Sequence, residues 1–147
     1  MLNMLSTYKL FAIPMIVIVS SQLLKLVIEA AGGNFSWKDI DKYGGMPSSH
    51  TAFVTSLVTI MGFTQGVNSS VFAISFVLAI LTIRDAMGLR RYLGNNSKVI
   101  NLLVKKLPDK DEIEFPHIEE RLGHTPLQVL VGIVLGVVVS LVLLKFL

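Results

Sequence analysis

The chain has 147 residues, of which 52% are apolar and 16% are charged, and its formal net charge is +3. Soluble domains carry about a quarter charged residues, so the composition favours a membrane protein of one domain, residues 1–147. The chain contains no cysteine, which excludes disulfides, thiolate catalysis and cysteine-ligated zinc. The basic residues form no stripe with interleaved aromatic residues, so we expect no nucleic-acid partner.

Apolar stretches along the chain predict an all-α, integral-membrane bundle of about four transmembrane helices. A membrane helix needs roughly 17–25 residues, and the second stretch reaches that length only if its helix begins near Ser48. Gly132 and Gly136 form a G-x-x-x-G pair, which permits close approach of another helix, but glycine is also simply common in membrane helices. The stretches are Leu10–Ile28 (with Pro14 inside it), Thr51–Phe63, Val71–Ile83 continuing to Leu89, and Pro126–Leu147.

The longest connection runs from Asn95 to Gly123. Its first half, Ser97–Leu107, has a helical apolar period and is expected to lie along the membrane surface as an interfacial helix. Pro108 ends that helix. We interpret the acidic residues that follow as a solvated loop: Asp109, Asp111, Glu112, Glu114, Glu119 and Glu120.

The distribution of basic residues predicts the orientation in the bilayer. With four spans, the two termini and the Gly66–Ser70 loop share one side, which holds only Lys9 and Lys145 among the basic residues. The other side holds nearly all the rest. Positive-inside bias therefore places the two long loops in the cytoplasm, in a membrane of the bacterial plasma-membrane type.

The segment Gly44–His50 combines two glycines, a proline, two hydroxyls and an imidazole directly before an apolar helix. The first N–H groups of a helix have no intrahelical partner, and the helix dipole makes that end positive. Such a terminus favours an anion such as phosphate, and His50 could exchange a proton with it near neutral pH. Each element also has an ordinary reading, since serines cap helices and an isolated histidine is usually an interfacial residue.

The polar residues near the membrane all fall on the predicted cytoplasmic side. Two histidines, several cations and two helix starts at one layer describe an anion site that can perform proton chemistry. Arg90 and Arg91 alone would indicate positive-inside anchors, and Asp85 beside Arg84 could be a local neutralising pair. The members of this layer are Lys25, His50, Arg84, Asp85, Arg90, Arg91 and His124.

Three motifs in this order carry a resemblance to a known family. Together, Pro47–His50, Arg84–Arg90 and Leu122–Leu127 resemble the divergent branch of the type 2 phosphatidic acid phosphatase superfamily, which also contains vanadium haloperoxidases and membrane lipid phosphatases. The resemblance covers about Gln22 to Gly136. Any one motif alone would be weak, whereas the three in order are fairly specific.

The resemblance implies the following roles. His124 matches the histidine that attacks phosphorus and becomes phosphohistidine, and His50 matches the histidine that protonates the leaving oxygen. Ser48 and the backbone around Ser49 match the part that holds the phosphate, and Lys25 stands where the family has its first-motif lysine. No metal or other cofactor is expected in that chemistry.

Arginine completes the implied site. Arg90 is the best match for a phosphate-binding arginine, since its planar fork can hold two phosphate oxygens, and Arg84 is a second candidate. The wider pattern has an arginine six residues before the nucleophilic histidine, where this chain has Ile118. Arg84, Arg90 or Arg121 must therefore supply that function.

A second departure concerns the residue that orients the nucleophile. The superfamily has an acidic residue four positions after that histidine, where this chain has Gln128. A glutamine carbonyl can accept the histidine N–H but cannot stabilise an imidazolium as a carboxylate would. Asp85 could orient a histidine instead, and the sequence leaves both readings open.

These observations favour a metal-independent lipid phosphatase acting on phosphatidylglycerol phosphate, phosphatidic acid or a polyprenyl phosphate or diphosphate. The alternative is a membrane scaffold that binds phospholipid or another anion without turnover. A transporter subunit fits less well, because transporter sites usually lie near the bilayer midplane. Because four helices form a thin bundle, a homodimer would help to shield the polar site from lipid.

Overall fold

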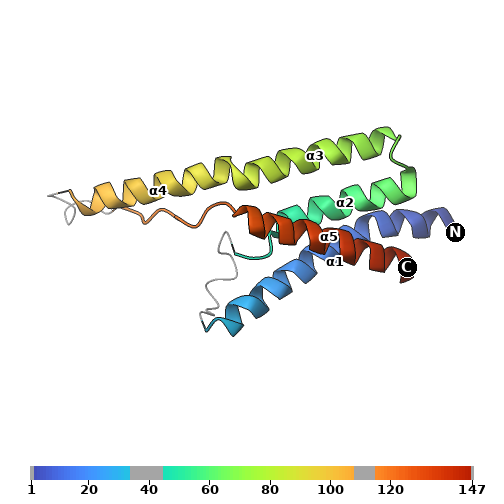
Figure 1. The fold of residues 1–147 in the computed structure, drawn as a ribbon, viewed down its shortest axis with the longest axis horizontal. Coiled ribbons are helices and arrows are strands. Elements are labelled where there is room, and N and C mark those ends of the chain that lie inside the picture. Colours follow the sequence, from blue (N-terminus) through green and yellow to red (C-terminus); the bar gives the residue numbers. More distant parts are fainter. Residues whose placement is uncertain (1, 34–44, 108–114, 147) are drawn as a thin grey trace.

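The computed structural model describes residues 2–33, 45–107 and 115–146, which contain helices and no strand (Figure 1). The all-helical prediction is confirmed. Gly44, Pro108 and the acidic residues Asp109, Asp111, Glu112 and Glu114 lie outside the described residues. The helices are α1 (Leu2–Ala31), α2 (Ser49–Gln65), α3 (Ser70–Met87), α4 (Leu89–Lys105) and α5 (Pro126–Phe146).

Three segments are long and apolar enough to cross a membrane: Tyr8–Ala31, Ser70–Lys105 and Pro126–Phe146. The helix α2 has 17 residues, which is at the lower limit of a spanning helix. It begins at Ser49, one residue from the predicted start, and it packs against α1, α3 and α5. The shortest apolar helix is therefore the centre of the bundle.

The helix α1 continues through Pro14 and changes direction partway along its length (Figure 1). Proline removes one backbone hydrogen bond and crowds the preceding turn, which bends a helix without ending it when tertiary contacts hold both sides. Those contacts are present, since Ile13 and Val17 are fully buried against Ala52 and Ile60 of α2. Leu10, Leu135, Val139, Leu143 and Leu144 pack around this core.

The closest helix contact is between α2 and α5. A Cβ placed on Gly132 would lie 2.6 Å from the Ser48 carbonyl oxygen, and one on Gly136 would lie 2.5 Å from that of Ala52. Deeper in the bundle, the Ser140 hydroxyl lies 2.7 Å from the Ser56 hydroxyl and forms a buried hydrogen bond. The G-x-x-x-G pair is therefore a packing motif, as small residues permit in membrane helices.

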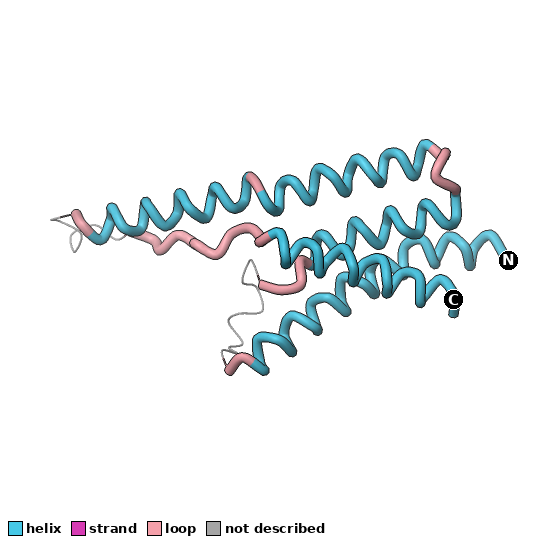
Figure 2. Tube along the Cα trace, in the orientation of Figure 1, coloured by secondary structure: helices cyan, strands magenta, loops and turns pink. Residues whose placement is uncertain are grey.

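The third apolar stretch and the predicted interfacial helix form one long rod. The second of these, α4, begins at Leu89 rather than near Ser97, and only Gly88 separates it from α3 (Figures 1 and 2). The sequence-based boundary was wrong because the charged and polar residues between Arg90 and Asn96 resemble a loop by composition. Gly88 has φ −104° and ψ −89°, and its N–H still bonds the Arg84 carbonyl, so the chain continues in nearly the same direction.

The contact between α2 and α5 predicts the effect of a single methyl group. Gly132→Ala should force the two helices apart and lower the free energy of unfolding by about 1–3 kcal/mol, the usual cost of overpacking. Gly32→Ala is the control, because its Cβ would meet neighbours only at 3.5 Å or more. Unfolding in mixed micelles, followed by circular dichroism, measures the difference. Equal stability of the two variants would contradict close packing at Gly132.

Candidate functional site

The predicted polar layer lies at one end of the bundle, where α1 and α3 end and α2 and α5 begin (Figures 1 and 2). Two backbone hydrogen bonds tie these elements together. The Ser48 N–H donates to the Gln128 carbonyl at 3.2 Å, and the His124 N–H donates to the Ala86 carbonyl at 2.9 Å. The starts of α2 and α5, each with its histidine, are thus held at the same level as the end of α3.

His124 is half-buried immediately before α5. Burial lowers the pKa of its ring, and the positive charge of Lys25 acts in the same direction, while the Gln128 side chain and the Gly45 carbonyl oppose the shift. The ring is therefore neutral near neutral pH. Its Nδ1 atom is buried and has no hydrogen-bond partner within the described part of the chain.

Gln128 has a local role that explains its position. Its side-chain oxygen accepts the Thr125 N–H at 2.9 Å, and its own N–H donates to the Thr125 hydroxyl at 3.3 Å. This reciprocal pair is a capping box, in which a threonine and a glutamine three residues later satisfy helix-start donors. The Thr-Pro-Leu-Gln sequence carries that signal. The Gln128 side chain also acts on the His124 ring, where it opposes the lowering of the pKa, so its predicted role in orienting that histidine stays a prediction beside the cap.

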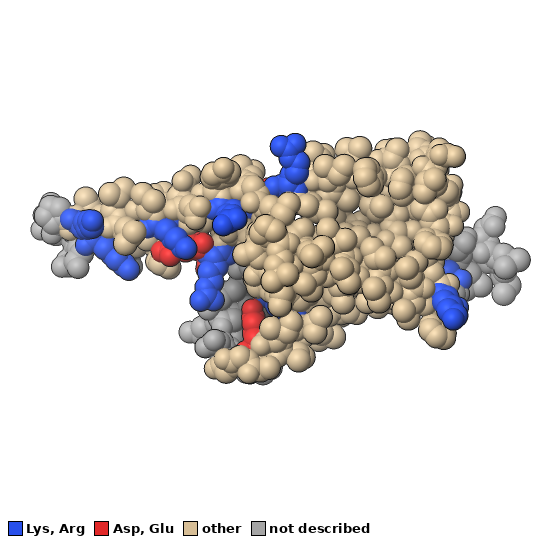
Figure 3. All heavy atoms as spheres, viewed as in Figure 1, with Lys and Arg blue, Asp and Glu red and all other residues tan. Residues whose placement is uncertain are grey.

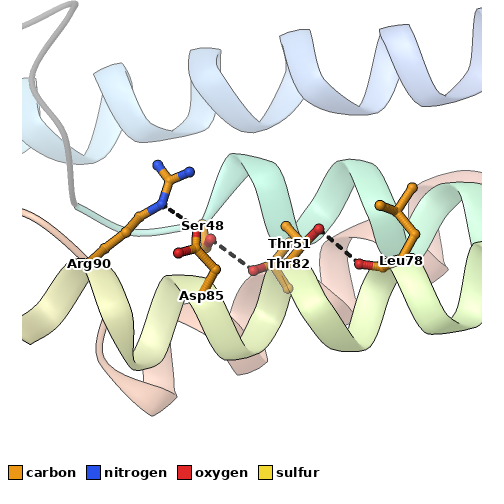
Figure 4. Close-up of polar contacts among 6 residues, drawn as sticks. All are labelled: Ser48, Thr51, Leu78, Thr82, Asp85 and Arg90. Carbon is orange, nitrogen blue, oxygen red and sulfur yellow. Dashed lines mark hydrogen bonds and ion pairs between the residues drawn. The ribbon is translucent and has the colours of Figure 1, made fainter.

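Asp85 near the end of α3 and Arg90 at the start of α4 form an ion pair. The Arg90 Nε lies 2.6 Å from Asp85 Oδ2, and both side chains are about one-third exposed, at 39% and 33%. Figure 4 shows the terminal guanidinium nitrogens of Arg90 pointing away from Asp85. Burial and the positive charge of Arg90 lower the pKa of His50, and the negative charge of Asp85 opposes that shift. The carboxylate thus fixes the arginine while leaving its outer fork available to an anion.

Lys25 and Glu29 of α1 meet at Gly45. Lys25 is buried, and a Cβ on Gly45 would lie 2.7 Å from Lys25 Cε and 3.1 Å from Glu29 Oε1. Gly45 has φ +88°, a conformation that glycine adopts without strain. Glu29 Oε2 is buried without a hydrogen-bond partner among the described residues. Sequence reasoning assigned Glu29 no role, although its spacing of four residues from Lys25 placed both on one helix face.

The remaining predicted residues occupy different positions. Ser48 is fully buried and its hydroxyl shares a 2.9 Å hydrogen bond with Thr51 (Figure 4), and Ser49 is also buried. His50 is exposed at the second position of α2. Arg84 lines an open groove where α3 meets α4. The phosphate-binding roles of Ser48, Ser49 and Arg84 stay predictions, and the Ser48 hydroxyl makes no capping bond to the backbone of α2.

A long-range clamp sets the position of His124. The segment 115–125, here called the strap, runs back along α4 towards α5 (Figure 1). The Asn101 amide donates to the Ile118 carbonyl and to Glu120 Oε1, each at 2.8 Å, and its oxygen accepts the Ile118 N–H at 3.2 Å. Glu120 is therefore a bonded residue rather than part of a solvated loop. Sequence reasoning missed Asn101, because its partners are remote in sequence.

Glycines allow the strap to lie directly on α4. A Cβ on Gly94 would lie 2.7 Å from the Glu120 carbonyl oxygen, and one on Gly123 would lie 2.7 Å from the Arg91 nitrogen. The strap then places His124 beside the end of α3. Within residues 2–33, 45–107 and 115–146, no group of three or more histidine, aspartate or glutamate side chains could hold a metal ion.

Comparison with known proteins decides the family. A model described as the divergent PAP2 family matches residues 6–139, which is most of the chain. The chain belongs to the divergent PAP2 family. A relative in Bacillus subtilis (strain 168), the uncharacterized membrane protein YuiD, is 37% identical over 141 residues, covering 88% of this chain and 89% of that protein. No solved structure matches the chain. This divergent PAP2 protein is a membrane protein, as its composition predicted.

The charge of Lys25 provides a test of the site's electrostatics. Lys25→Met should raise the pKa of His124, because it removes a positive charge that disfavours the imidazolium. Titration of ¹⁵N-labelled histidine by NMR measures the shift, and the exposed His117 on the strap is an internal control that should not move. An unchanged or lower His124 pKa would show that Lys25 does not act on this ring.

The clamp predicts a local opening. Asn101→Ala removes the three hydrogen bonds that its amide makes to Ile118 and Glu120, each of which contributes about 0.5–1.5 kcal/mol. Amide hydrogen exchange should therefore accelerate at Ile118 and along the strap. Asn96→Ala, at an exposed position of the same helix, should leave exchange unchanged. Equal protection in both variants would mean that the strap does not depend on Asn101.

Proposed function

We propose that this divergent PAP2 protein is a metal-independent lipid phosphatase that forms a phosphohistidine on His124. The observation that carries the proposal is the convergence of a neutral, half-buried His124, His50, Lys25 and the outer fork of Arg90 at one end of a membrane bundle. A phosphate on a lipid reaches such a site without leaving the bilayer.

In the proposed reaction, a ring nitrogen of His124 attacks phosphorus, and the bond from phosphorus to the lipid oxygen breaks. Because Nδ1 is enclosed, we assign the attack to Nε2. His50 in its protonated form donates that proton to the departing oxygen, so this step slows as the pH rises above the lowered pKa of His50. In the second step His50 accepts a proton from the water that attacks phosphohistidine. Phosphate is released and both histidines return to their starting states.

The cations supply the electrostatic part of this chemistry. Phosphoryl transfer depends mainly on positioning and on stabilising charge at the equatorial oxygens. Arg90 offers a planar fork held in place by Asp85, and Lys25 offers a buried point charge. The attraction of each cation for phosphate oxygens is stronger in a partly buried site than in water. The lowered pKa of His124 keeps the nucleophile unprotonated, which is the form that attacks.

A specific observation favours a second candidate function, a membrane scaffold that binds anions without turnover. Gln128 is engaged in the α5 cap and Asp85 in the pair with Arg90. Neither gives His124 the carboxylate that the wider superfamily uses to stabilise an imidazolium. Such a site would still bind phosphate through the same cations.

The proposed setting follows from the basic residues. We place the site at the cytoplasmic leaflet of a bacterial-type plasma membrane, since all the basic residues except Lys9 and Lys145 fall on the side of the two long loops. The proposed substrates are phosphatidylglycerol phosphate, phosphatidic acid and polyprenyl phosphates or diphosphates. A homodimer that covers part of the bundle is the proposed assembly.

Phosphate release tests the proposal. Purified protein in mixed micelles should release phosphate from at least one of these lipids in the presence of a chelator. His124→Ala should abolish release, and His50→Ala should reduce it by roughly 10²–10⁴-fold, the usual contribution of a general acid. His117→Ala is the matched control and should retain wild-type activity. Activity should fall on the acidic side as His124 becomes protonated, at a pH below the ordinary histidine value of about 6.5.

The two candidate functions predict different results in this assay. Vanadate binding without phosphate release from any of the lipids would favour the scaffold. Phosphate release that His124→Ala leaves unchanged would contradict the proposed nucleophile.

A further inference from the structure

The helix α4 buries its polar side and exposes its apolar side, the reverse of a helix in a soluble domain. The side that faces the strap consists of small and polar residues, and Gly94, Ser97 and Asn101 are its buried members. The opposite side carries large apolar residues at intervals of three, four and seven, all exposed. This outer face consists of Leu89, Tyr92, Leu93, Val99, Ile100 and Leu103. An exposed apolar stripe of this kind is typical of a surface that binds a membrane or another protein.

The outer face continues the lipid-facing side of α3. The exposed apolar residues Ile74, Val77 and Leu81 belong to the same apolar span, Ser70–Lys105, of 36 residues. Figure 3 shows an upper edge of both helices without charged side chains except for basic atoms near their junction. At 1.5 Å per residue the rod is roughly 54 Å long, whereas the hydrocarbon core is about 30 Å thick. A straight rod would therefore carry the outer face into water.

Charge on the remaining surface of α4 complements an anionic bilayer. Arg91, Lys98, Lys105 and Lys106 lie outside the outer face, and Figure 3 shows basic side chains gathered on the opposite edge of α4. A helix with one apolar side and one basic side is typical of segments that lie in the plane of a membrane surface. Anionic lipids strengthen such binding through the basic residues.

The junction of α3 and α4 offers places for lipid headgroups. One open groove of about 460 Å³ is lined by Arg84, Asp85, Met87, Gly88 and Leu89. Next to it, a groove of about 380 Å³ is lined by Met87, Gly88, Arg91, Tyr92 and Asn95. Arginine binds phosphate oxygens in pairs, and tyrosine is enriched at the boundary of lipid and water. Both grooves therefore have the chemistry of the headgroup layer.

The break at Gly88 is where the rod can turn. If α3 is upright and α4 tilts towards the side shared by the two apolar stripes, the outer face comes to lie on the bilayer. The strap, on the other side of α4, then faces the cytoplasm. Gly123 of the strap contacts the backbone of Arg90 and Arg91, close to Gly88 in sequence. The strap and the rod thus each carry a glycine near the junction of α3 and α4.

We propose that α4 turns at Gly88 and docks its outer face on the cytoplasmic surface of an anionic phospholipid bilayer, with Arg84 and Arg91 binding lipid headgroups in the junction grooves. The docked lipids are distinct from the phosphate bound near His124. The helix thereby anchors the strap that holds His124, and it fixes the height of the site above the bilayer. This inference stands whether the site is a phosphatase or a scaffold.

The absence of cysteine makes the test direct, since each introduced cysteine is unique. Val99→Cys and Leu103→Cys place a fluorophore on the outer face, and Lys98→Cys is the control on the basic side of the same helix. The full-length protein is reconstituted in phosphatidylcholine vesicles with or without phosphatidylglycerol. Quenchers attached to lipid chains should reach labels at 99 and 103, and aqueous iodide should reach the label at 98.

The anionic lipid should strengthen this pattern, and Arg84→Gln with Arg91→Gln should remove that dependence. Strong iodide quenching at 99 and 103 in anionic vesicles would overturn the proposal, because the outer face would then lie in water. Spin labels at the same sites distinguish docking on the bilayer from contact with a second copy of the chain. Dipolar broadening at 99 and 103 without lipid quenching would overturn membrane docking in favour of a dimer interface.

Discussion

The close contact between α2 and α5 is the constraint on which the rest of the structure depends. The backbone carbonyls of Ser48 and Ala52 lie where side chains at Gly132 and Gly136 would otherwise stand. In a bilayer, apolar side chains gain little from leaving lipid, so helix association relies on close packing and on hydrogen bonds such as the one between Ser56 and Ser140. This contact brings together the two helix starts that carry the histidines.

The second requirement is a fixed approach to α5, and α4 provides it from outside the bundle. A segment before a helix is usually the most variable part of a fold, since its backbone groups must find partners. Here Asn101 pairs with Ile118, and the His124 N–H pairs with the carbonyl of Ala86. Two buried polar atoms remain without hydrogen-bond partners among the described residues, Nδ1 of His124 and Oε2 of Glu29. Unsatisfied polar atoms concentrated in a site with a shifted histidine pKa are typical of functional positions.

Much of this arrangement was predictable from the sequence. Apolar length and composition predict about four spans, of which three are long and apolar enough in the structure, and they predict the helix start near Ser48. The start of α4 was not predictable, because Arg90, Arg91, Asn95 and Asn96 together with Gly94 are typical of a loop. The Asn101 clamp joins residues 17 and 19 positions apart, and no local pattern encodes it. Gln128 was interpreted only from its distance to His124, and its additional role in the cap of α5 was missed.

We propose above all that the starts of α2 and α5 form a single phosphate site that contains His50 and His124. The chain has three histidines, and the third, His117, lies exposed on the strap. Titration of the ¹⁵N-histidine-labelled protein in micelles with vanadate, a phosphate analogue, tests the claim most directly. The account predicts that the ring resonances of His50 and His124 shift together with one dissociation constant while those of His117 stay fixed. A shift of His117 alone, or no shift of His124 at saturating vanadate, would contradict it.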